Sequence, residues 1–206
     1  MAREDEPLLN VGTWHERSWA NGPGQRFVLW MQGCPRRCPG CVNPQFLPMV
    51  SRHRFSVEEL AARILAVRDI EGVTYTGGEP LLQAYGLALL SRRLRSAGKT
   101  IVCYTGETLA SLRLHDDPWE AELLELIDIL IDGPYVRAEA ANLLWRGSRN
   151  QQVHFLSDVY RHLAPELETR AAEVELMAGC DDFTTTGTWP DGFVERLEER
   201  LKSGCL

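Results

Sequence analysis

The sequence has no long run of apolar residues. No stretch approaches the roughly 20 consecutive apolar residues that a membrane-spanning helix needs, so we expect no membrane partner. Internal repeats and low-complexity tracts are also absent, which argues against a disordered chain. Residues 1–7 are acidic, whereas a secretory signal has a basic segment followed by an apolar one. We therefore expect the protein to stay in the cytoplasm.

Positive charge is in deficit. The chain has 22 Lys and Arg against 29 Asp and Glu, a formal net charge of −7. A molecule with this charge repels a phosphate backbone, so we expect no nucleic-acid partner. The acidic excess is concentrated between residues 115 and 140, where Arg137 is the only basic residue. We interpret this stretch as a solvated helix face.

The length and composition predict one folded domain. A chain of 206 residues lies near the upper end of the usual size for a single domain, and residues 1–206 are expected to share one core. Hydrophobic residues make up 44% and charged residues 25%, which are ordinary values for a globular protein.

The sequence has few cysteines, but half of them lie close together. Three of the six cysteines form the pattern C-x3-C-x2-C at Cys34, Cys38 and Cys41. The others, Cys103, Cys180 and Cys205, are isolated. Because cytosolic thiols stay reduced, clustered cysteines in such a chain are more often ligands or catalysts than disulfides.

The cysteine spacing alone leaves three hypotheses open. A zinc site would need a fourth ligand, for which His53 is a candidate. A dithiol redox site would use only Cys38 and Cys41, and would leave Cys34 without a function. An iron–sulfur cluster held by three thiolates would leave one iron open, which suits an enzyme better than an electron carrier.

Hydrophobic patterning predicts strands that alternate with helices. We expect strands over 26–32, 72–76, 99–104 and 128–132. We expect helices over 57–68 and 81–94, and helical segments that follow Gly106 and extend as far as Ile127. Ser56 and Glu59 form a predicted capping box at the start of the first helix. Strands over 152–156 and 172–177 and a helix over 193–202 complete the prediction. This alternation favours parallel β/α units, whose sites lie at the carboxyl ends of the strands.

Gly77, Gly78 and Glu79 follow one of these predicted strands. A glycine pair lets a ligand approach the backbone closely, and the adjacent carboxylate can pair with an ammonium group. The alternative is a tight turn with a surface glutamate. Together with the cysteine loop, the segment describes a site with an open metal position and a clamp for an amino acid. S-adenosylmethionine fits that description, since it has a chelating amino-carboxylate and a cleavable sulfonium bond.

Several segments resemble the radical S-adenosylmethionine enzymes. Residues 21–41 resemble their glycine-proline-glycine lead, first strand and cluster loop, and residues 76–83 resemble their aminomethionine motif. Residues 128–135 and 145–151 resemble later segments of the small activating enzymes of glycyl-radical proteins, above all those that act on anaerobic ribonucleotide reductases. The resemblance covers roughly residues 10–155.

The resemblance implies a fold and a division of the chain. The expected fold is α/β, a partial (β/α)6-type barrel of parallel strands with the cluster loop after the first strand. Residues 1–20 would be an N-terminal extension, residues 21–155 the core that resembles the family, and residues 156–206 a less certain C-terminal part.

The resemblance also implies cofactors. A [4Fe–4S] cluster would be held by Cys34, Cys38 and Cys41, which are therefore the expected metal ligands and catalytic residues. S-adenosylmethionine would bind the unique iron through its amine and carboxylate, with Glu79 and the adjacent glycines holding the ammonium group. The expected cofactor-binding residues are Gly33, Gly40, Gly77, Gly78, Glu79, Thr105 and Asp132.

The implied function is that of a radical S-adenosylmethionine activating enzyme. An electron from the cluster cleaves S-adenosylmethionine, and the resulting 5′-deoxyadenosyl radical abstracts hydrogen from a partner protein to form a glycyl radical. The expected partners are a glycyl-radical enzyme, such as an anaerobic ribonucleotide reductase, and an electron donor such as flavodoxin or ferredoxin. Two alternatives stay open: a radical reaction on another peptide or small molecule, and a non-catalytic zinc or iron–sulfur structural module.

Overall fold

The computed structural model describes residues 7–178, 183–189 and 192–203. Its strands are β1 (Leu9–Ser18), β2 (Arg26–Met31), β3 (His53–Phe55), β4 (Gly72–Gly77), β5 (Thr100–Tyr104), β6 (Ile129–Asp132), β7 (Ala140–Leu143), β8 (Arg146–Ser148), β9 (Gln152–Phe155), β10 (Val174–Ala178) and β11 (Phe183–Gly187). Its α-helices are α1 (Val57–Ala66), α2 (Ala84–Ser96), α3 (Leu109–Leu112), α4 (Pro118–Leu126) and α5 (Phe193–Lys202). Short 3-10 helices are η1 (Pro44–Phe46), η2 (Pro80–Gln83), η3 (Arg137–Glu139) and η4 (Arg161–Glu166). Among the described residues, no helix is both long and apolar enough to span a membrane.

The centre of the fold is a seven-stranded sheet in the order β3-β1-β2-β4-β5-β6-β9. Strands β2, β4, β5 and β6 are parallel, which confirms the predicted parallel α/β core. The edges differ from a purely parallel barrel, because β9 pairs antiparallel with β6, and β1 pairs antiparallel with β2 and β3. Residues 9–18 belong to the predicted N-terminal extension, residues 1–20. In the structure they form a strand of the main sheet.

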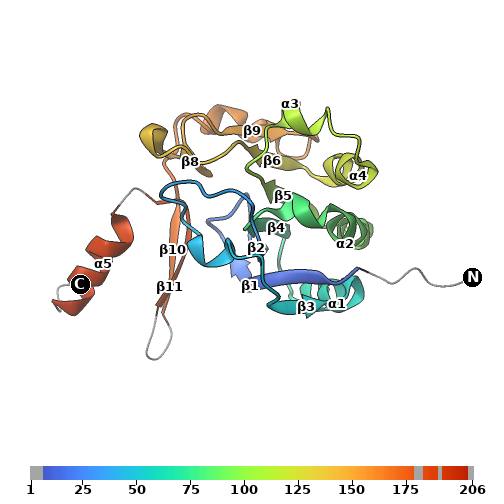
Figure 1. Ribbon diagram of the computed structural model, residues 1–206, viewed down its shortest axis with the longest axis horizontal. Coiled ribbons are helices and arrows are strands. Elements are labelled where there is room, and N and C mark those ends of the chain that lie inside the picture. Colours follow the sequence, from blue (N-terminus) through green and yellow to red (C-terminus); the bar gives the residue numbers. More distant parts are fainter. Residues whose placement is uncertain (1–6, 179–182, 190–191, 204–206) are drawn as a thin grey trace, which may run out of the picture.

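The two faces of the sheet carry different cores. Helices α1, α2 and α4 cover one face, while β10 and β11 stand on the opposite side (Figure 1). Along β2, Phe27, Leu29 and Met31 pack in the large core beneath the helices. The intervening Val28 and Trp30 form a separate cluster with Phe46 on the other face. This follows from the strand geometry, in which successive side chains point to opposite faces.

The predicted helix over 57–68 is confirmed as α1, together with its capping box. The Ser56 hydroxyl accepts a hydrogen bond from the backbone N of Glu59 over 3.2 Å, and Oε2 of Glu59 accepts one from the backbone N of Ser56 over 2.8 Å. The predicted helix over 81–94 instead opens with the 3-10 turn η2 before α2 begins. Pro80 at its first position needs no N–H partner, which suits a helix start.

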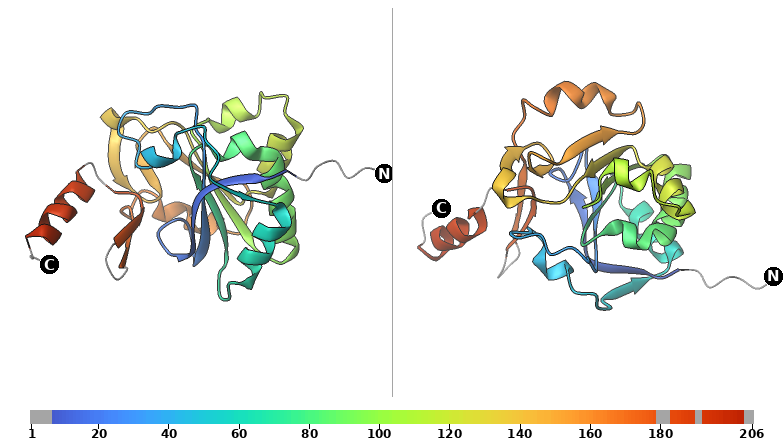
Figure 2. Two further views of the ribbon diagram at one scale, coloured as in Figure 1. Left: turned by 60° about the horizontal axis from the view of Figure 1, so that its bottom comes forward. Right: turned by 45° about the horizontal axis from the view of Figure 1, so that its top comes forward.

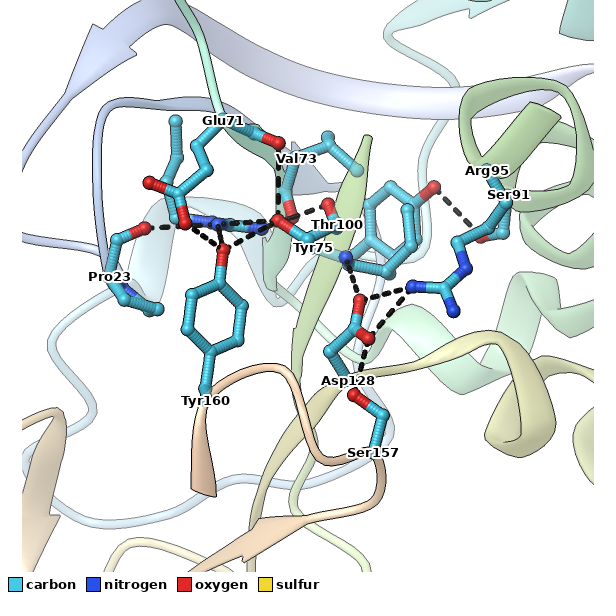
Figure 3. A network of polar contacts seen from close by, with 12 residues as sticks. Pro23, Glu71, Val73, Tyr75, Ser91, Arg95, Thr100, Asp128, Ser157 and Tyr160 are labelled. Carbon is cyan, nitrogen blue, oxygen red and sulfur yellow. Dashed lines mark hydrogen bonds and ion pairs between the residues drawn. The ribbon is translucent and has the colours of Figure 1, made fainter. Parts of the chain in front are cut away.

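The acidic stretch is only partly a solvated helix face. Asp116, Asp117 and Glu125 are exposed, but Asp128 is completely buried. Its carboxylate accepts two hydrogen bonds from Arg95 Nη1, over 2.8 and 2.6 Å. It also accepts from the backbone N of Ile101 over 2.8 Å and from Ser157 Oγ over 2.6 Å (Figure 3). Asp128 therefore joins α2, β5 and the segment after β9.

A second polar network closes the amino ends of the parallel strands. The fully buried Arg26 guanidinium donates to Thr74 Oγ1 over 2.8 Å and to the carbonyl oxygen of Val73 over 2.7 Å. The Tyr160 hydroxyl lies 2.8 Å from Thr100 Oγ1 and donates to Glu71 (Figure 3). These hydrogen bonds satisfy the buried charge of Arg26. They also connect Tyr160, in the segment after β9, to the amino ends of the parallel strands.

Candidate active site

A cavity lies where the carboxyl ends of the parallel strands meet the sheet face that the helices leave free. Its volume is about 1050 Å³, including space open to solvent. Four loops that follow β2, β4, β5 and β6 contribute to its wall, as the parallel topology predicts.

The cysteine loop forms one wall of this cavity. Cys34, Cys38 and Cys41 all line it as free thiols; Cys34 is buried and the other two are half-buried. The loop is anchored because Gly33 N donates to Phe46 O over 2.9 Å and Cys34 N donates to Leu47 O over 3.1 Å. One short loop therefore presents three thiols to the same space.

This donor set fits an iron–sulfur cluster better than a zinc ion. His53, the possible fourth zinc ligand, lies on β3 with its ring 5.4 Å from the Trp14 ring, outside the cavity wall. As they stand, the described residues contain no group of three His, Cys, Asp or Glu side chains close enough to hold a metal. A metal held by all three cysteines would require their thiols to move closer together, which is common where metal binding is coupled to local folding.

Burial controls the protonation of these thiols. It raises the pKa of Cys34 above the ordinary value of 9.0, and the negative charge of Glu79 adds to the effect. Burial also raises the pKa of Cys41, with a smaller contribution from Cys38. Both thiols are thus mainly protonated near pH 7, and a metal that bound them would have to displace these protons.

The two glycines at the end of β4, Gly77 and Gly78, let this strand end pack against the cysteine loop. Gly77 has φ +97°, and a Cβ there would lie 2.7 Å from the backbone N of Met31. A Cβ on Gly78 would lie 2.3 Å from the carbonyl oxygen of Gly33, and that oxygen accepts a hydrogen bond from Glu79 N over 2.8 Å. Close packing between two protein loops, besides access for a ligand, therefore requires both glycines.

The carboxylate of Glu79 is buried and holds another loop in place. Its Oε1 accepts hydrogen bonds from Thr105 Oγ1 over 2.8 Å and from Leu81 N over 3.2 Å, and its Oε2 accepts one from Gly106 N over 2.9 Å. Burial raises the pKa of Glu79, while these bonds oppose the rise. A carboxylate has about four acceptor positions, so one remains for an external donor.

The structure brings most of the expected site residues together, but not all. Those that line the cavity are Cys34, Cys38, Cys41, Gly77, Gly78, Glu79 and Thr105. Gly33 and Gly40 are not in its wall; Gly33 supports the loops from behind, and Gly40 lies close to Tyr135. Cys180 and Cys205 lie outside the described residues, and Cys103 is buried in the core beneath the helices.

Asp132 requires a correction, because it faces away from the cavity. Its carboxylate accepts a hydrogen bond from Leu109 N over 2.6 Å and lies 2.9 Å from Nε2 of His154. Strand alternation explains this orientation. Ile129 and Ile131 face the cavity side of the sheet, so Leu130 and Asp132 face the helix side.

Several cavity residues had no role in the sequence-based site. Trp30, Tyr104 and Trp145 provide aromatic walls. Trp145 is buried with φ +59°, which is rare for a bulky residue, and its indole nitrogen has no hydrogen-bond partner among the described residues. The alternation of β2 could have placed Trp30 beside the cavity. No local signal pointed to the wall formed by residues 185–189.

Comparison with known proteins shows the family. Residues 20–154 match the family described as a 4Fe-4S single cluster domain. The chain is 35% identical over 156 residues to an anaerobic ribonucleoside-triphosphate reductase-activating protein of Vibrio cholerae, covering 71% of this chain and 97% of that protein. The protein of the same name in Escherichia coli K12 is 31% identical over 157 residues, which cover 72% of this chain and 99% of that protein. The protein of the same name in Enterobacteria phage T4 is 32% identical over 162 residues, which cover 75% of this chain and 99% of that protein.

Among solved structures, QueE from Escherichia coli aligns with 49% of this chain and 54% of its own, at a TM-score of 0.40 and 19% identity. The sequence matches are far more extensive, and the family match over residues 20–154 includes both the cysteine loop and the Gly77–Glu79 loop. The chain therefore belongs to the radical S-adenosylmethionine family of anaerobic ribonucleoside-triphosphate reductase-activating proteins, which carry a [4Fe–4S] cluster.

Proposed function

We propose that this protein activates an anaerobic ribonucleotide reductase by forming a glycyl radical on it. The observation that carries the proposal is the convergence of two loops on one cavity. The loop with Cys34, Cys38 and Cys41 meets the loop with Gly77 and Glu79, so a cluster and an amino acid ligand can be held side by side. The relatives named above support the choice of a reductase as the partner.

The three thiolates would hold the cluster and leave one iron for the amine and carboxylate of S-adenosylmethionine. When bound and reduced, the cluster supplies the electron that splits the sulfonium bond, which yields the radical that takes hydrogen from the partner's glycine. Glu79 would accept a hydrogen bond from the ammonium group at its remaining acceptor position. Thr105 and Gly106 hold that carboxylate in one orientation.

The other walls of the cavity limit what reaches this site. Trp30, Tyr104 and Trp145 present aromatic surface from the sheet face and from the β7–β8 turn. Aromatic walls exclude water from the space next to the thiols, which strengthens the polar contacts that hold a charged ligand.

We further propose that the electron donor is a flavodoxin or a ferredoxin, and that the reaction takes place in the cytoplasm. Arg37, Arg52 and Arg54 are exposed in and after the cysteine loop, so an acidic donor would meet opposite charge there. A reducing compartment keeps three free thiols available for iron.

The test is radical transfer with purified components. The protein is reconstituted anaerobically with iron and sulfide, reduced, and mixed with S-adenosylmethionine and the anaerobic ribonucleotide reductase of its own host. We expect a glycyl radical signal in the paramagnetic resonance spectrum of the reductase and formation of 5′-deoxyadenosine. The Cys38→Ala variant should yield neither. A reconstituted cluster that cleaves S-adenosylmethionine without any radical on the reductase would refute the proposed partner.

A further inference from the structure

The hairpin formed by β10 and β11 is an added wall of the active-site cavity. It lies beyond residues 20–154, the part of the chain that matches the family. Residues 185–189 nevertheless line the same cavity as the three cysteines. Figure 2 shows the hairpin beside the sheet on the side away from α1, α2 and α4. This chain therefore completes its cavity with a segment outside the family's matched region.

Buried hydrogen bonds fix the hairpin to the core. Nδ2 of Asn21 donates to Ser18 Oγ over 2.8 Å and to Thr186 Oγ1 over 2.7 Å. Ser18 Oγ in turn donates to Oε2 of Glu175 on β10, over 2.6 Å. Ser18, Asn21 and Thr186 are all buried. Polar groups that are buried and satisfied in this way hold one arrangement, so the hairpin is a defined wall of the cavity.

The chemistry of this wall differs from that of the cofactor loops. Residues 185–189 carry three threonine hydroxyls, one glycine and one indole, and no charge. The Thr186 hydroxyl is used by Asn21, whereas those of Thr185 and Thr188 have no hydrogen-bond partner in the part of the chain that the structure describes. A hydroxyl both donates and accepts, so these two can satisfy either kind of backbone group.

We propose that Thr185 and Thr188 bind the main chain of the partner's glycine-bearing segment. The inference rests on the proposed function, because it takes the substrate to be a glycine in a protein. Glycine has no side chain, and a site that selects it must bind its N–H and C=O groups. The Gly77–Glu79 loop and Thr105 serve the cofactor, whereas Thr185 and Thr188 bring two uncharged hydroxyls to the same cavity. Trp189 adds a flat surface for the peptide planes.

The test compares two double variants that separate hydrogen bonding from shape. Thr185→Val with Thr188→Val keeps the side-chain shape and removes both hydroxyls, whereas Thr185→Ser with Thr188→Ser keeps both hydroxyls. The measurement is glycyl radical formation at increasing concentrations of the host's anaerobic ribonucleotide reductase. Removing two hydrogen bonds should raise the reductase concentration for half-maximal activation about tenfold, from about 1 kcal/mol or less per bond. The serine variant should stay within about twofold of the wild type.

Controls identify which idea has failed. The affinity for S-adenosylmethionine and the absorbance of the cluster should match the wild type in both double variants, because other loops hold those groups. Thr169→Val, on the exposed surface after η4, should change nothing. If the wild type activates the reductase and the valine variant needs no more reductase than the serine variant, the hairpin does not bind the substrate. If the wild type forms no radical on the reductase, the proposed function itself has failed.

Discussion

The hydroxyl of Thr105 donates a hydrogen bond to Oε1 of Glu79 over 2.8 Å, across the carboxyl ends of β4 and β5. Because the next residue, Gly106, donates to Oε2 of the same carboxylate, Glu79 joins two loops of the cavity. Glu79 therefore has a structural role, which is to hold the loop after β5, in addition to the expected contact with the ligand's ammonium group. Substitutions at Glu79 therefore test both roles.

Replacing Glu79 by Gln should weaken binding of S-adenosylmethionine and leave the cluster intact. Glutamine keeps the volume and one acceptor oxygen but lacks the charge that an ammonium group needs. A charge-assisted hydrogen bond contributes about 1.5–3 kcal/mol, so the dissociation constant should rise roughly 10- to 150-fold. Both oxygens of Glu79 accept from protein donors, so the NH2 group of glutamine faces one of these donors, and the free energy of unfolding should fall in Glu79→Gln. It should fall further in Glu79→Ala, since the donors on Leu81, Thr105 and Gly106 all lose their acceptor. Unchanged affinity together with a loss of iron in Glu79→Gln would show that the residue only supports the metal loop.

Each of Cys34, Cys38 and Cys41 should be essential for the cluster. Their replacement by Ala removes one of three thiolates, and the broad absorbance near roughly 400 nm should disappear after reconstitution. Cys103→Ala is the matched control, because that thiol is buried in the core beneath the helices and not in the cavity wall. Analysis of iron and sulfide content measures the effect. A full [4Fe–4S] content in Cys38→Ala would overturn the assignment of the site.

Iron uptake by the protein without metal should become stronger as the pH rises from about 7 to about 9. Burial raises the pKa of Cys34 and Cys41, and only the thiolate forms bind iron, so each must lose a proton on binding. At higher pH the deprotonated forms are more populated, and the competition with protons decreases. Anaerobic titration with ferrous iron and sulfide at several pH values measures the apparent affinity. An affinity that stays constant over this range would contradict the prediction.

Asp128→Ala should destabilise the fold without changing the cavity. The substitution leaves Arg95, the backbone N of Ile101 and the Ser157 hydroxyl without their shared acceptor (Figure 3). Removal of one partner of a buried ion pair costs about 3 kcal/mol or more of the free energy of unfolding. Arg93→Ala is the control, because Arg93 and Glu58 form an ion pair whose side chains are 61% and 55% exposed. That pair should contribute less than about 1 kcal/mol. Urea unfolding of the protein without metal compares the two variants.

Local patterns in the sequence were enough for the parallel core and the metal loop. Ser56 and Glu59 lie three residues apart, and the hydrogen bonds of the capping box form within that distance. The three cysteines share one loop, so their spacing alone predicts that they face the same space. Gly77, Gly78 and Glu79 end a strand that runs parallel to β2, and parallel strands bring their carboxyl ends to one edge.

Only the tertiary structure decided which side chains complete the cavity. Asp132 ends the expected strand, but the phase of alternation in β6 turns it toward α3, and that phase depends on how the strand pairs with its neighbours. The hydrogen bond from Asn21 to Thr186 joins residues 165 positions apart in the chain. A contact over that distance leaves no periodicity or motif in the sequence, because it is created by the packing of the hairpin against the core. That the three cysteines line one cavity was therefore predictable from local spacing, whereas the hairpin wall depended on long-range packing.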